Sequence, residues 1–223
     1  MNKSLSNDDL LEYLSKQLNN NFPDNDNLNN LVFVVNEALS KLEYNFRHVA
    51  LPYYLKDGKP FFNHLNSDHY TVFLYYCSNV AYKIDDISLA SKFFYLNKIM
   101  NSFHCMYDTE LPDIFIVCHG VGTVLGKAKY ENFFVVTQGC TVGANARWDY
   151  PRLGKYLIMY PNSSILGGSI ISNYVIASNN SMILNENIPD SCLVVGRYPN
   201  TLIKENNLST YAQFFKSAEL ING

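Results

Sequence analysis

The sequence has no surplus of positive charge: 17 Lys and Arg residues stand against 20 Asp and Glu, and the formal net charge is −3. A broad nucleic-acid-binding surface needs clustered basic side chains, so this balance excludes one. There is also no apolar run of about 18 residues, the minimum for a transmembrane helix. We therefore expect no membrane span. The first residues, MNKSLSNDDLLEYL, lack the apolar stretch of a secretory signal and predict a cytoplasmic protein.

Paired cysteine motifs are missing too. The five cysteines are odd in number and widely spread, and no two of them form a CxxC pair. They are Cys77, Cys105, Cys118, Cys140 and Cys192. We expect isolated buried thiols rather than a disulfide scaffold or a zinc ribbon. What the chain does have is 223 residues, 48% of them apolar, enough for one large domain or two small ones.

The first part of the chain, up to residue 104, has helical periodicity. Apolar residues recur at steps of three and four behind a capping Ser6 or Asn7, and again after the turn-forming stretch 23–30. The two stripes are Leu10, Leu11, Leu14 and Leu18, then Leu31, Val34, Val35, Ala38 and Leu42. The sequence therefore predicts two amphipathic helices separated by a break.

Two more helices are predicted over 70–82 and 87–103, joined by a turn at 83–86. The stretch 48–68 contains two prolines and a glycine, which favour turns and interrupt regular elements. We predict that this stretch is irregular.

From residue 111 onward the apolar period becomes six. The clearest positions are Leu153, Met159, Ile165, Ile171, Ala177 and Ile183, and the same spacing links Tyr130, Val136 and Val142, and Leu111 and Val117. The residues four places further on are mostly small, namely Leu157, Ser163, Ser169, Val175 and Ser181. A period of six fits neither a helix nor a strand, but it is typical of a parallel β-helix, in which each hexad forms a short strand and a corner. Chance spacing in an apolar segment is the alternative, and six hits in a row disfavour it.

Four segments of this region resemble, in the same order, motifs of serine acetyltransferases and their relatives. They are CHGVGTVLGKA at 118–128, TQGCTVG at 137–143, YPRLG at 150–154 and IPDSCLVVGRYPNTLIK at 188–204. The resemblance implies an acetyl-CoA-dependent enzyme. It also implies an α+β fold, with an N-terminal α-helical domain at 1–104, a left-handed parallel β-helix at 105–204 and a short C-terminal tail at 205–223.

His119 is the candidate general base. The histidine of the corresponding turn has this role in the family, and HGVGTVLG matches that motif from His119 to Gly126. A hydroxyl is a poor nucleophile at neutral pH, and an imidazole can take its proton while the oxygen attacks a thioester carbonyl. The resemblance implies direct transfer without a covalent enzyme intermediate. The alternative is a histidine that packs at a β-helix corner against backbone carbonyls.

The chain departs from the family at the amino-acid site. The family's aspartate before the catalytic histidine, which helps to bind the substrate's amino group, is replaced by Cys118. Its second histidine and the neighbouring arginine, which binds the serine carboxylate, are replaced by Tyr150 and Asp149. A further family aspartate of the N-terminal domain falls around Asp68 and Tyr70, near His64, in our alignment. The aspartate that would orient the base falls near His104. The resemblance therefore supports acetyl-CoA chemistry, but an aspartate would repel a serine carboxylate.

The loop 144–151 carries the only tryptophan, Trp148, beside polar residues. An aromatic ring next to polar groups suits a sugar, and relatives without the second histidine resemble glycan O-acetyltransferases. The alternative is that Trp148 anchors the loop against a neighbouring subunit. We expect the acceptor to be a sugar or a glycan precursor of capsule, O-antigen or exopolysaccharide. The candidate acceptor-binding residues are Cys118, Trp148, Asp149, Tyr150 and His104.

Acetyl-CoA is the expected co-substrate. The resemblance places its pantetheine arm in a groove between adjacent β-helices, held mostly by backbone groups. The matching positions are Gly143, Pro161 and Ser178, with Arg197 and Lys204 as candidate phosphate partners; simple solvation is the alternative for the two cations. No metal site is expected, because His119 is the only histidine after residue 104. The family also implies a homotrimer, in which two trimers can pair.

Three functions stay open. The first is an O-acetyltransferase that acts on a sugar or glycan hydroxyl. The second is a serine O-acetyltransferase of cysteine biosynthesis with a remodelled acceptor site. The third is a non-catalytic β-helix that serves as an assembly or regulatory subunit, and the intact HGVGTVLG motif counts against it.

Overall fold

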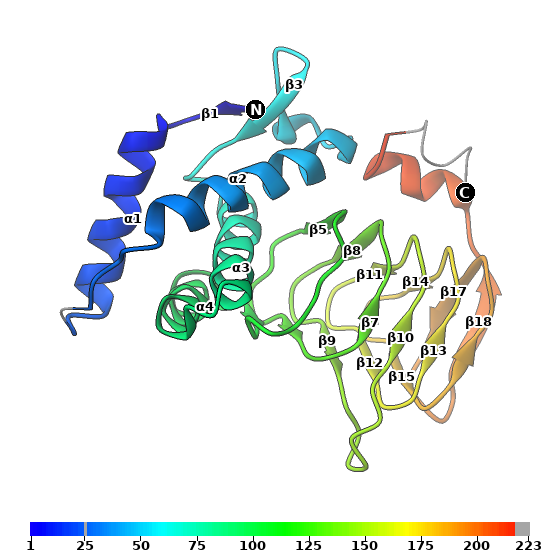
Figure 1. Ribbon diagram of the computed structural model, residues 1–223. Coiled ribbons are helices and arrows are strands. Elements are labelled where there is room, and N and C mark those ends of the chain that lie inside the picture. The colour runs from blue at the N-terminus through cyan, green and yellow to red at the C-terminus, as the bar shows by residue number, and fades with distance from the viewer. Residues whose placement is uncertain (25, 217–223) are drawn as a thin grey trace.

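The computed structural model describes residues 1–24 and 26–216. Helices form the N-terminal part, and a solenoid of short parallel strands follows (Figure 1). The helices are α1 (Asn7–Asn21), α2 (Leu31–His48), α3 (Ser67–Lys83) and α4 (Ile87–Asn101), with the 3-10 turns η1 (Pro52–Tyr54) and η2 (Leu208–Gln213). The four helices predicted from the sequence are confirmed, with ends shifted by a few residues. No described helix is long and apolar enough to cross a membrane.

Side-chain caps fix where three of these helices begin. The Ser6 hydroxyl accepts a hydrogen bond from the backbone of Asp9 at the start of α1, and Asp86 caps α4 in the same way. At α3, the Asn66 side chain accepts from the backbone N–H groups of Asp68 and His69. The cap thereby fixes the first turn of α3, from which Asp68 points toward the solenoid.

The stretch 48–68 is more regular than the sequence predicted. It contains β2 (Leu55–Lys56) and β3 (Lys59–Phe62), which form a small sheet with β1 (Asn2–Lys3) in the order β1-β3-β2. The turn between β2 and β3 is Asp57–Gly58, and both residues have positive φ, at 53° and 71°. An Asp-Gly pair is a strong hairpin signal. The strands are so short that no alternating pattern reveals them.

The solenoid has three parallel sheets, and one complete turn takes 18 residues where Arg152 pairs with Ile170 and Ser164 with Met182. We call them sheet 1 (β4, β6, β9, β12, β15), sheet 2 (β5, β8, β11, β14, β17, β18) and sheet 3 (β7, β10, β13, β16). Their bounds are β4 (His104–Cys105), β5 (Phe115–Val117), β6 (Val124–Leu125), β7 (Lys129–Tyr130), β8 (Phe134–Val136), β9 (Thr141–Gly143), β10 (Arg152–Leu153), β11 (Ile158–Met159), β12 (Ser164–Leu166), β13 (Ile170–Ile171), β14 (Ile176–Ala177), β15 (Met182–Leu184), β16 (Asn187–Ile188), β17 (Cys192–Val195) and β18 (Leu202–Glu205).

The hexad positions form the core of the solenoid. All the apolar residues found at spacing six are buried, and so are the residues four places later. The serines among the latter fit because a side chain at that point lies inside a tight corner, where there is little volume. The period of six therefore arises from side chains that point into the interior of a three-sided prism, as the sequence predicted.

The first corner between sheet 2 and sheet 1 is longer than those below it. Val136, at the end of β8 in sheet 2, and Thr141, at the start of β9 in sheet 1, are five positions apart in sequence. The residues that pair with them in the next two turns have the same separation. From Val117 to Val124 they are seven apart. The two extra residues make the segment 118–122 bulge out of the prism, and His119 lies on this bulge.

The chain then returns toward the helices. Strand β18 runs antiparallel to β17, and η2 follows it along the solenoid (Figure 1). The backbone of Ala50 donates to Phe214, and Val49 forms a bridge with Phe215. The C-terminal segment thus braces the stretch that leads into η1. The predicted division at 104 and 204 stays a prediction, and residues 217–223 of the predicted tail lie outside the described residues.

Candidate functional site

His119 protrudes from the long corner into solvent. Its backbone has a φ of 54°, in the left-handed region, and its side chain is 81% exposed. Other residues between strands of the solenoid, such as Tyr156 and Asn180, share this conformation, so it belongs to the corners of this fold. The exposed imidazole is accessible to ligands from several directions, which is unlike a histidine packed into a corner.

Asp68, on the first turn of α3, contacts His119 through both of its carboxylate oxygens. Its Oδ1 accepts a hydrogen bond of 2.9 Å from the backbone N–H of His119, and its Oδ2 lies 4.0 Å from His119 Nδ1. The Asp68 side chain is largely buried, and burial raises its pKa, opposed by hydrogen bonds from the backbone of His119 and Gly120. A buried carboxylate therefore faces the inner nitrogen of an exposed imidazole.

This arrangement has the geometry of an oriented base. A carboxylate beside Nδ1 favours the tautomer in which Nδ1 carries the proton, so that Nε2 is free to accept one. The separation of 4.0 Å is longer than a hydrogen bond, and such contacts often tighten only when substrate is bound. The pair can therefore take a proton from a ligand at Nε2 and stabilise the resulting imidazolium.

A cavity of about 270 Å³ opens beside the pair, between the solenoid and the helices. Its lining is Ser67, Asp68, Thr71, Met100, Asn101, Ser102, His119, Gly120 and Val121. Asp68 is the only carboxylate and no Lys or Arg takes part. The cavity therefore suits a small neutral molecule with hydroxyl groups and offers no cation to a carboxylate.

Cys118 lies next to His119 on the side of η1. Its thiol is buried, and burial together with the charge of Asp68 raises its pKa to about 12. A thiol with so high a pKa is protonated at neutral pH and is a poor nucleophile. The structure thus gives Cys118 neighbours but no means of activation.

Two of the predicted coenzyme positions lie on the same edge as His119. The corner between sheets 2 and 1 carries one residue in register from each successive turn, namely Cys118, Thr137, Tyr160 and Ser178. Pro161 follows Tyr160 on that corner. Gly143 belongs to β9 of sheet 1, and Arg197 pairs with Met182 below β15 of the same sheet. Lys204 is on β18, the last strand of sheet 2.

The predicted acceptor loop lies elsewhere on the chain. Trp148, Asp149 and Tyr150 fall between β9 and β10, at the corner of sheets 1 and 3, whereas His119 is at the corner of sheets 2 and 1. Trp148 is 75% exposed. The Asp149 carboxylate accepts a 2.8 Å hydrogen bond from the Asn145 side chain, which stiffens the loop. Within one chain, the loop and the base are therefore not brought together.

His104 is not next to the orienting acid, which corrects our alignment. Its ring packs edge-on against Phe94 at 5.2 Å between centroids, and burial lowers its pKa. The acid that faces the base is Asp68, 51 residues before it in sequence. Our alignment placed a further family aspartate around Asp68 but gave the orienting role to the position of His104, because the contact joins the helices to the solenoid and no local pattern shows it. The sequence signal that could have identified Asp68 is an acidic residue two positions after Asn66, near the predicted start of a helix.

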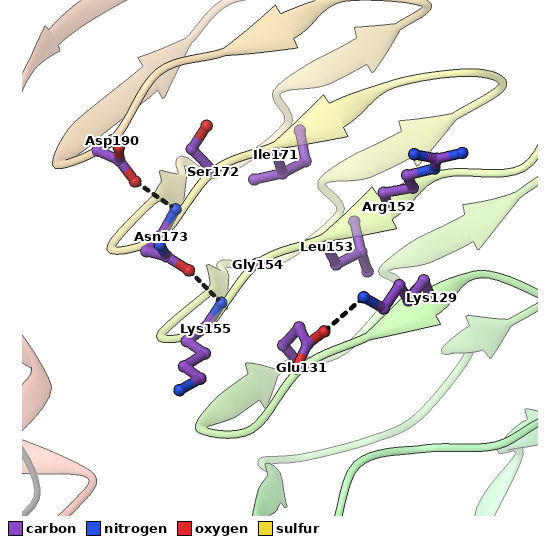
Figure 2. A pocket seen from close by; sticks show the side chains of 10 residues that line it. All are labelled: Lys129, Glu131, Arg152, Leu153, Gly154, Lys155, Ile171, Ser172, Asn173 and Asp190. Carbon is purple, nitrogen blue, oxygen red and sulfur yellow. Dashed lines mark hydrogen bonds and ion pairs between the residues drawn. The ribbon is translucent and has the colours of Figure 1, made fainter. Parts of the chain in front are cut away.

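A second hollow, of about 470 Å³, lies on the outer face of sheet 3 (Figure 2). Three cations line it, but Lys129 forms an ion pair of 2.9 Å with Glu131. The side-chain oxygens of Asn173 and Asp190 are used by backbone N–H groups of the neighbouring turns. It contains no histidine or cysteine. Its two carboxylates are engaged, Glu131 with Lys129 and Asp190 with the backbone of Asn173, so the cavity at His119 is the better candidate site.

Among residues 1–24 and 26–216, no three His, Cys, Asp or Glu side chains gather in a way that could hold a metal ion. The pair of His119 and Asp68 is the chemical core of the site.

Sequence comparisons find no relatives: no protein-family model and no curated protein matches the chain. Solved structures do match its fold. The serine acetyltransferase of Neisseria gonorrhoeae superposes with a TM-score of 0.68 and 16% identity, over 93% of this chain and 83% of that one. That of Vibrio cholerae gives a TM-score of 0.66 and 14% identity, over 79% and 72%. A serine acetyltransferase in complex with CoA superposes with a TM-score of 0.63 and 14% identity, over 78% of this chain and 75% of that one. The chain therefore has the serine acetyltransferase fold, and the predicted α+β class with a left-handed β-helix is confirmed.

Proposed function

We propose that this protein is an acetyl-CoA-dependent O-acetyltransferase with His119 as its general base. The observation that carries the proposal is the pair of Asp68 and His119 on the lengthened corner of a β-helix with this fold. A scaffold without catalytic function has no need of an exposed imidazole that faces a buried carboxylate on a lengthened corner. This counts against the assembly or regulatory subunit.

In the proposed reaction, His119 Nε2 takes the proton of an acceptor hydroxyl while the hydroxyl oxygen attacks the acetyl carbonyl carbon. A new carbon–oxygen bond forms, and the carbon–sulfur bond of the thioester breaks. The imidazolium then gives its proton to the departing thiolate sulfur. The Asp68 carboxylate stabilises the imidazolium in between. Cys118 takes no part as a nucleophile, because its pKa of about 12 keeps it a thiol.

The proposed coenzyme path follows the edge below His119. Pro161 and Ser178 lie on this edge, and Gly143 and Arg197 lie on the adjoining sheet 1. Two of the serine acetyltransferase structures with this fold contain coenzyme A. We infer that acetyl-CoA lies along the edge, with Arg197 and Lys204 at its phosphate end.

Two acceptor classes have support. The solved structures favour serine, since they are serine acetyltransferases and two of them hold cysteine. The residues of this chain favour a neutral sugar or glycan precursor. The cavity at His119 has no cation, and Asp149 is bound within its own loop. Without a cation, the serine carboxylate would lack a charge-assisted hydrogen bond. Such a bond contributes roughly 1.5–3 kcal/mol of binding free energy, or about ten- to a hundred-fold in affinity.

We further propose a homotrimer. The His119 corner and the Trp148 corner border the two sides of sheet 1, so that neighbouring prisms related by threefold symmetry can bring one chain's loop to the other chain's base. In such an assembly Trp148 and Tyr150 contact the acceptor of an adjacent chain. Pairing of two trimers and a cytoplasmic location remain predictions.

The test is acetyl-CoA turnover by His119→Asn, since asparagine tolerates the left-handed conformation but cannot act as the base. We expect turnover to fall by about two to four orders of magnitude with coenzyme binding retained. Coenzyme release is followed with a thiol reagent, which the protein's five buried cysteines do not consume quickly. His64→Gln serves as the control, because His64 contacts Ser4 far from the corner in sequence. Near-normal turnover in a folded His119→Asn protein would refute the assignment.

L-serine and a panel of methyl glycosides are compared as acceptors in the same assay. Efficient acetylation of serine supports the serine alternative. Transfer to a glycoside supports the sugar.

A further inference from the structure

The end of α4 forms one wall of the cavity beside His119. Met100 and Asn101, the last residues of α4, line this cavity together with Ser102. The backbone N–H of Gly122, on the long corner, donates a 3.0 Å hydrogen bond to the carbonyl of Ser102. The corner that carries His119 and the end of α4 are therefore held together, and the backbone of Asn101 has a fixed place relative to the base.

Hydrogen bonds between α4 and α3 fix the orientation of the Asn101 amide. The backbone carbonyl of Thr71, on α3, receives a 3.0 Å hydrogen bond from the buried side chain of Asn97, and a carbonyl can only accept. Asn97 must therefore present its NH2 group to Thr71, which leaves its Oδ1 to face Asn101. Asn101 in turn donates from Nδ2 to this oxygen at 2.8 Å. Flipping either amide would place two donors or two acceptors face to face.

This arrangement leaves the carbonyl oxygen of Asn101 without a partner. Asn97 uses the Nδ2 of Asn101, and among residues 1–24 and 26–216 no donor bonds to its Oδ1. The residue is half-buried, and Oδ1 is not one of the buried polar atoms, so a molecule in the cavity can reach it. A ligand group that faces this oxygen has to be a hydrogen-bond donor.

The other polar groups of the cavity favour the same kind of ligand. The Asp68 carboxylate is an acceptor when ionised, and Thr71 already donates its hydroxyl hydrogen to the carbonyl of Ser67 at 2.7 Å. The C-terminal end of α4 adds partial negative charge from its last carbonyls. The lining contains no cation, and its one carboxylate already faces the imidazole of His119. A carboxylate would be repelled here, an ammonium group would find no ion-pair partner of its own, and hydroxyl groups fit.

We propose that Asn101 is a specificity-determining residue that recognises a second hydroxyl of the acceptor. One hydroxyl gives its proton to His119, and a neighbouring hydroxyl of the same molecule donates a hydrogen bond to Asn101 Oδ1. The favoured acceptor is therefore a neutral molecule with adjacent hydroxyls, such as the diol of a sugar ring. This inference rests on the proposed acetyl transfer. Because Asn97 already orders the Asn101 side chain, little conformational entropy is lost on binding.

The experiment compares Asn101→Ala, which removes the amide, with Asn101→Asp, which keeps an accepting oxygen but loses the donor to Asn97. Asn21→Ala is the matched control, because Asn21 is the last residue of α1 and its Nδ2 also donates to the residue four places earlier, Gln17. Initial rates are measured with acetyl-CoA and methyl glycosides of glucose, galactose and mannose, and then with monodeoxy forms of the best of them. Acceptor-free hydrolysis is subtracted, and the melting temperature checks the fold of each variant.

For the best glycoside, we expect kcat/KM to fall about 3- to 10-fold in Asn101→Ala, the effect of one neutral hydrogen bond. One monodeoxy glycoside that keeps the reacting hydroxyl should be equally poor with the wild type. It should lose nothing more in Asn101→Ala, because both partners of the bond are then absent. The KM for acetyl-CoA should stay within about twofold.

The aspartate variant separates recognition from a structural role. Asn101→Asp should keep more activity toward the glycoside than Asn101→Ala, because its carboxylate can still accept from the acceptor hydroxyl. If Asn101 only maintained the fold, the aspartate would be the worse variant, since its carboxylate faces the oxygen of Asn97. Asn21→Ala should match the wild type with every substrate.

Three results would overturn the inference about Asn101 while leaving acetyl transfer intact. One is a kcat/KM that Asn101→Ala leaves unchanged, or lowers equally for the glycoside and all its deoxy forms. Another is His119-dependent turnover of acetyl-CoA with no transfer to any glycoside. The third is efficient acetylation of L-serine. If acetyl-CoA turnover does not depend on His119 at all, the proposed function itself fails, and the two failures are thus distinguishable.

Discussion

Replacing Asp68 by asparagine tests the pairing of acid and base most directly. The amide keeps an oxygen that can accept from the backbone N–H of His119, so the corner should keep its shape, but the negative charge is lost. Opposite unit charges 4.0 Å apart interact by about 1 kcal/mol in water and about 4 kcal/mol near a protein surface. Because the imidazole is largely exposed, an intermediate value of about 2 kcal/mol is appropriate, which corresponds to about 30-fold in rate.

We therefore expect kcat of Asp68→Asn to fall about 30-fold with little change in the KM for acetyl-CoA. The same variant should not unfold. Burial raises the pKa of Asp68, so the ionised carboxylate is disfavoured in the folded protein, and the stability linked to this group is present at low pH and lost as the pH rises through the raised pKa. Removing the charge costs none of that stability at neutral pH.

Melting curves and initial rates of the same preparations check both expectations. The melting temperature at neutral pH should stay within about 4 °C of the wild type. The difference in melting temperature between the wild type and Asp68→Asn should shrink below pH 3.8, the ordinary pKa of an aspartate. At such pH values Asp68 is protonated in both the folded and the unfolded chain. Asp57→Asn, in the exposed hairpin turn, is the control. A folded Asp68→Asn protein with turnover within about threefold of the wild type would show that the carboxylate does not assist the base.

Two further predictions concern the solenoid. Gly154→Ala should destabilise the protein by about 1–3 kcal/mol in denaturant unfolding, because the new Cβ would lie 2.7 Å from the backbone of Ser172, whereas Gly168→Ala, with its nearest neighbour at 3.6 Å, should cost far less. Equal effects of the two changes would mean that the turns of the solenoid can move apart. Mass photometry should find particles of three chains; an active particle of one chain would contradict the trimer and the shared site together.

The sequence was most informative where structure repeats. Six apolar residues at a spacing of six can all be buried only if the chain turns at regular corners, so Leu153 to Ile183 predicted the prism without any knowledge of contacts. The helices followed equally well from stripes such as Leu10, Leu14 and Leu18, whose period is set by the helix itself. In both cases the signal is local and repeated, and several positions support one another.

The site was less predictable because its parts come from segments that are far apart. His119 stood out through the motif around it, but Asp68 carries no motif and meets His119 only because α3 packs over the first turn of the solenoid. No spacing rule connects these positions.

A break in the repeat is a further sequence signal that falls at the site. The frame of six that contains Val117 does not continue to Tyr130, which lies 13 residues later, so the prism must contain an irregular corner between them. A corner with extra residues lets a side chain leave the regular row and face the helices that pack on the solenoid. This corner carries His119, and α3 covers it with Asp68. Regularity predicts the scaffold of this protein, and the interruption of that regularity marks where its chemistry is expected.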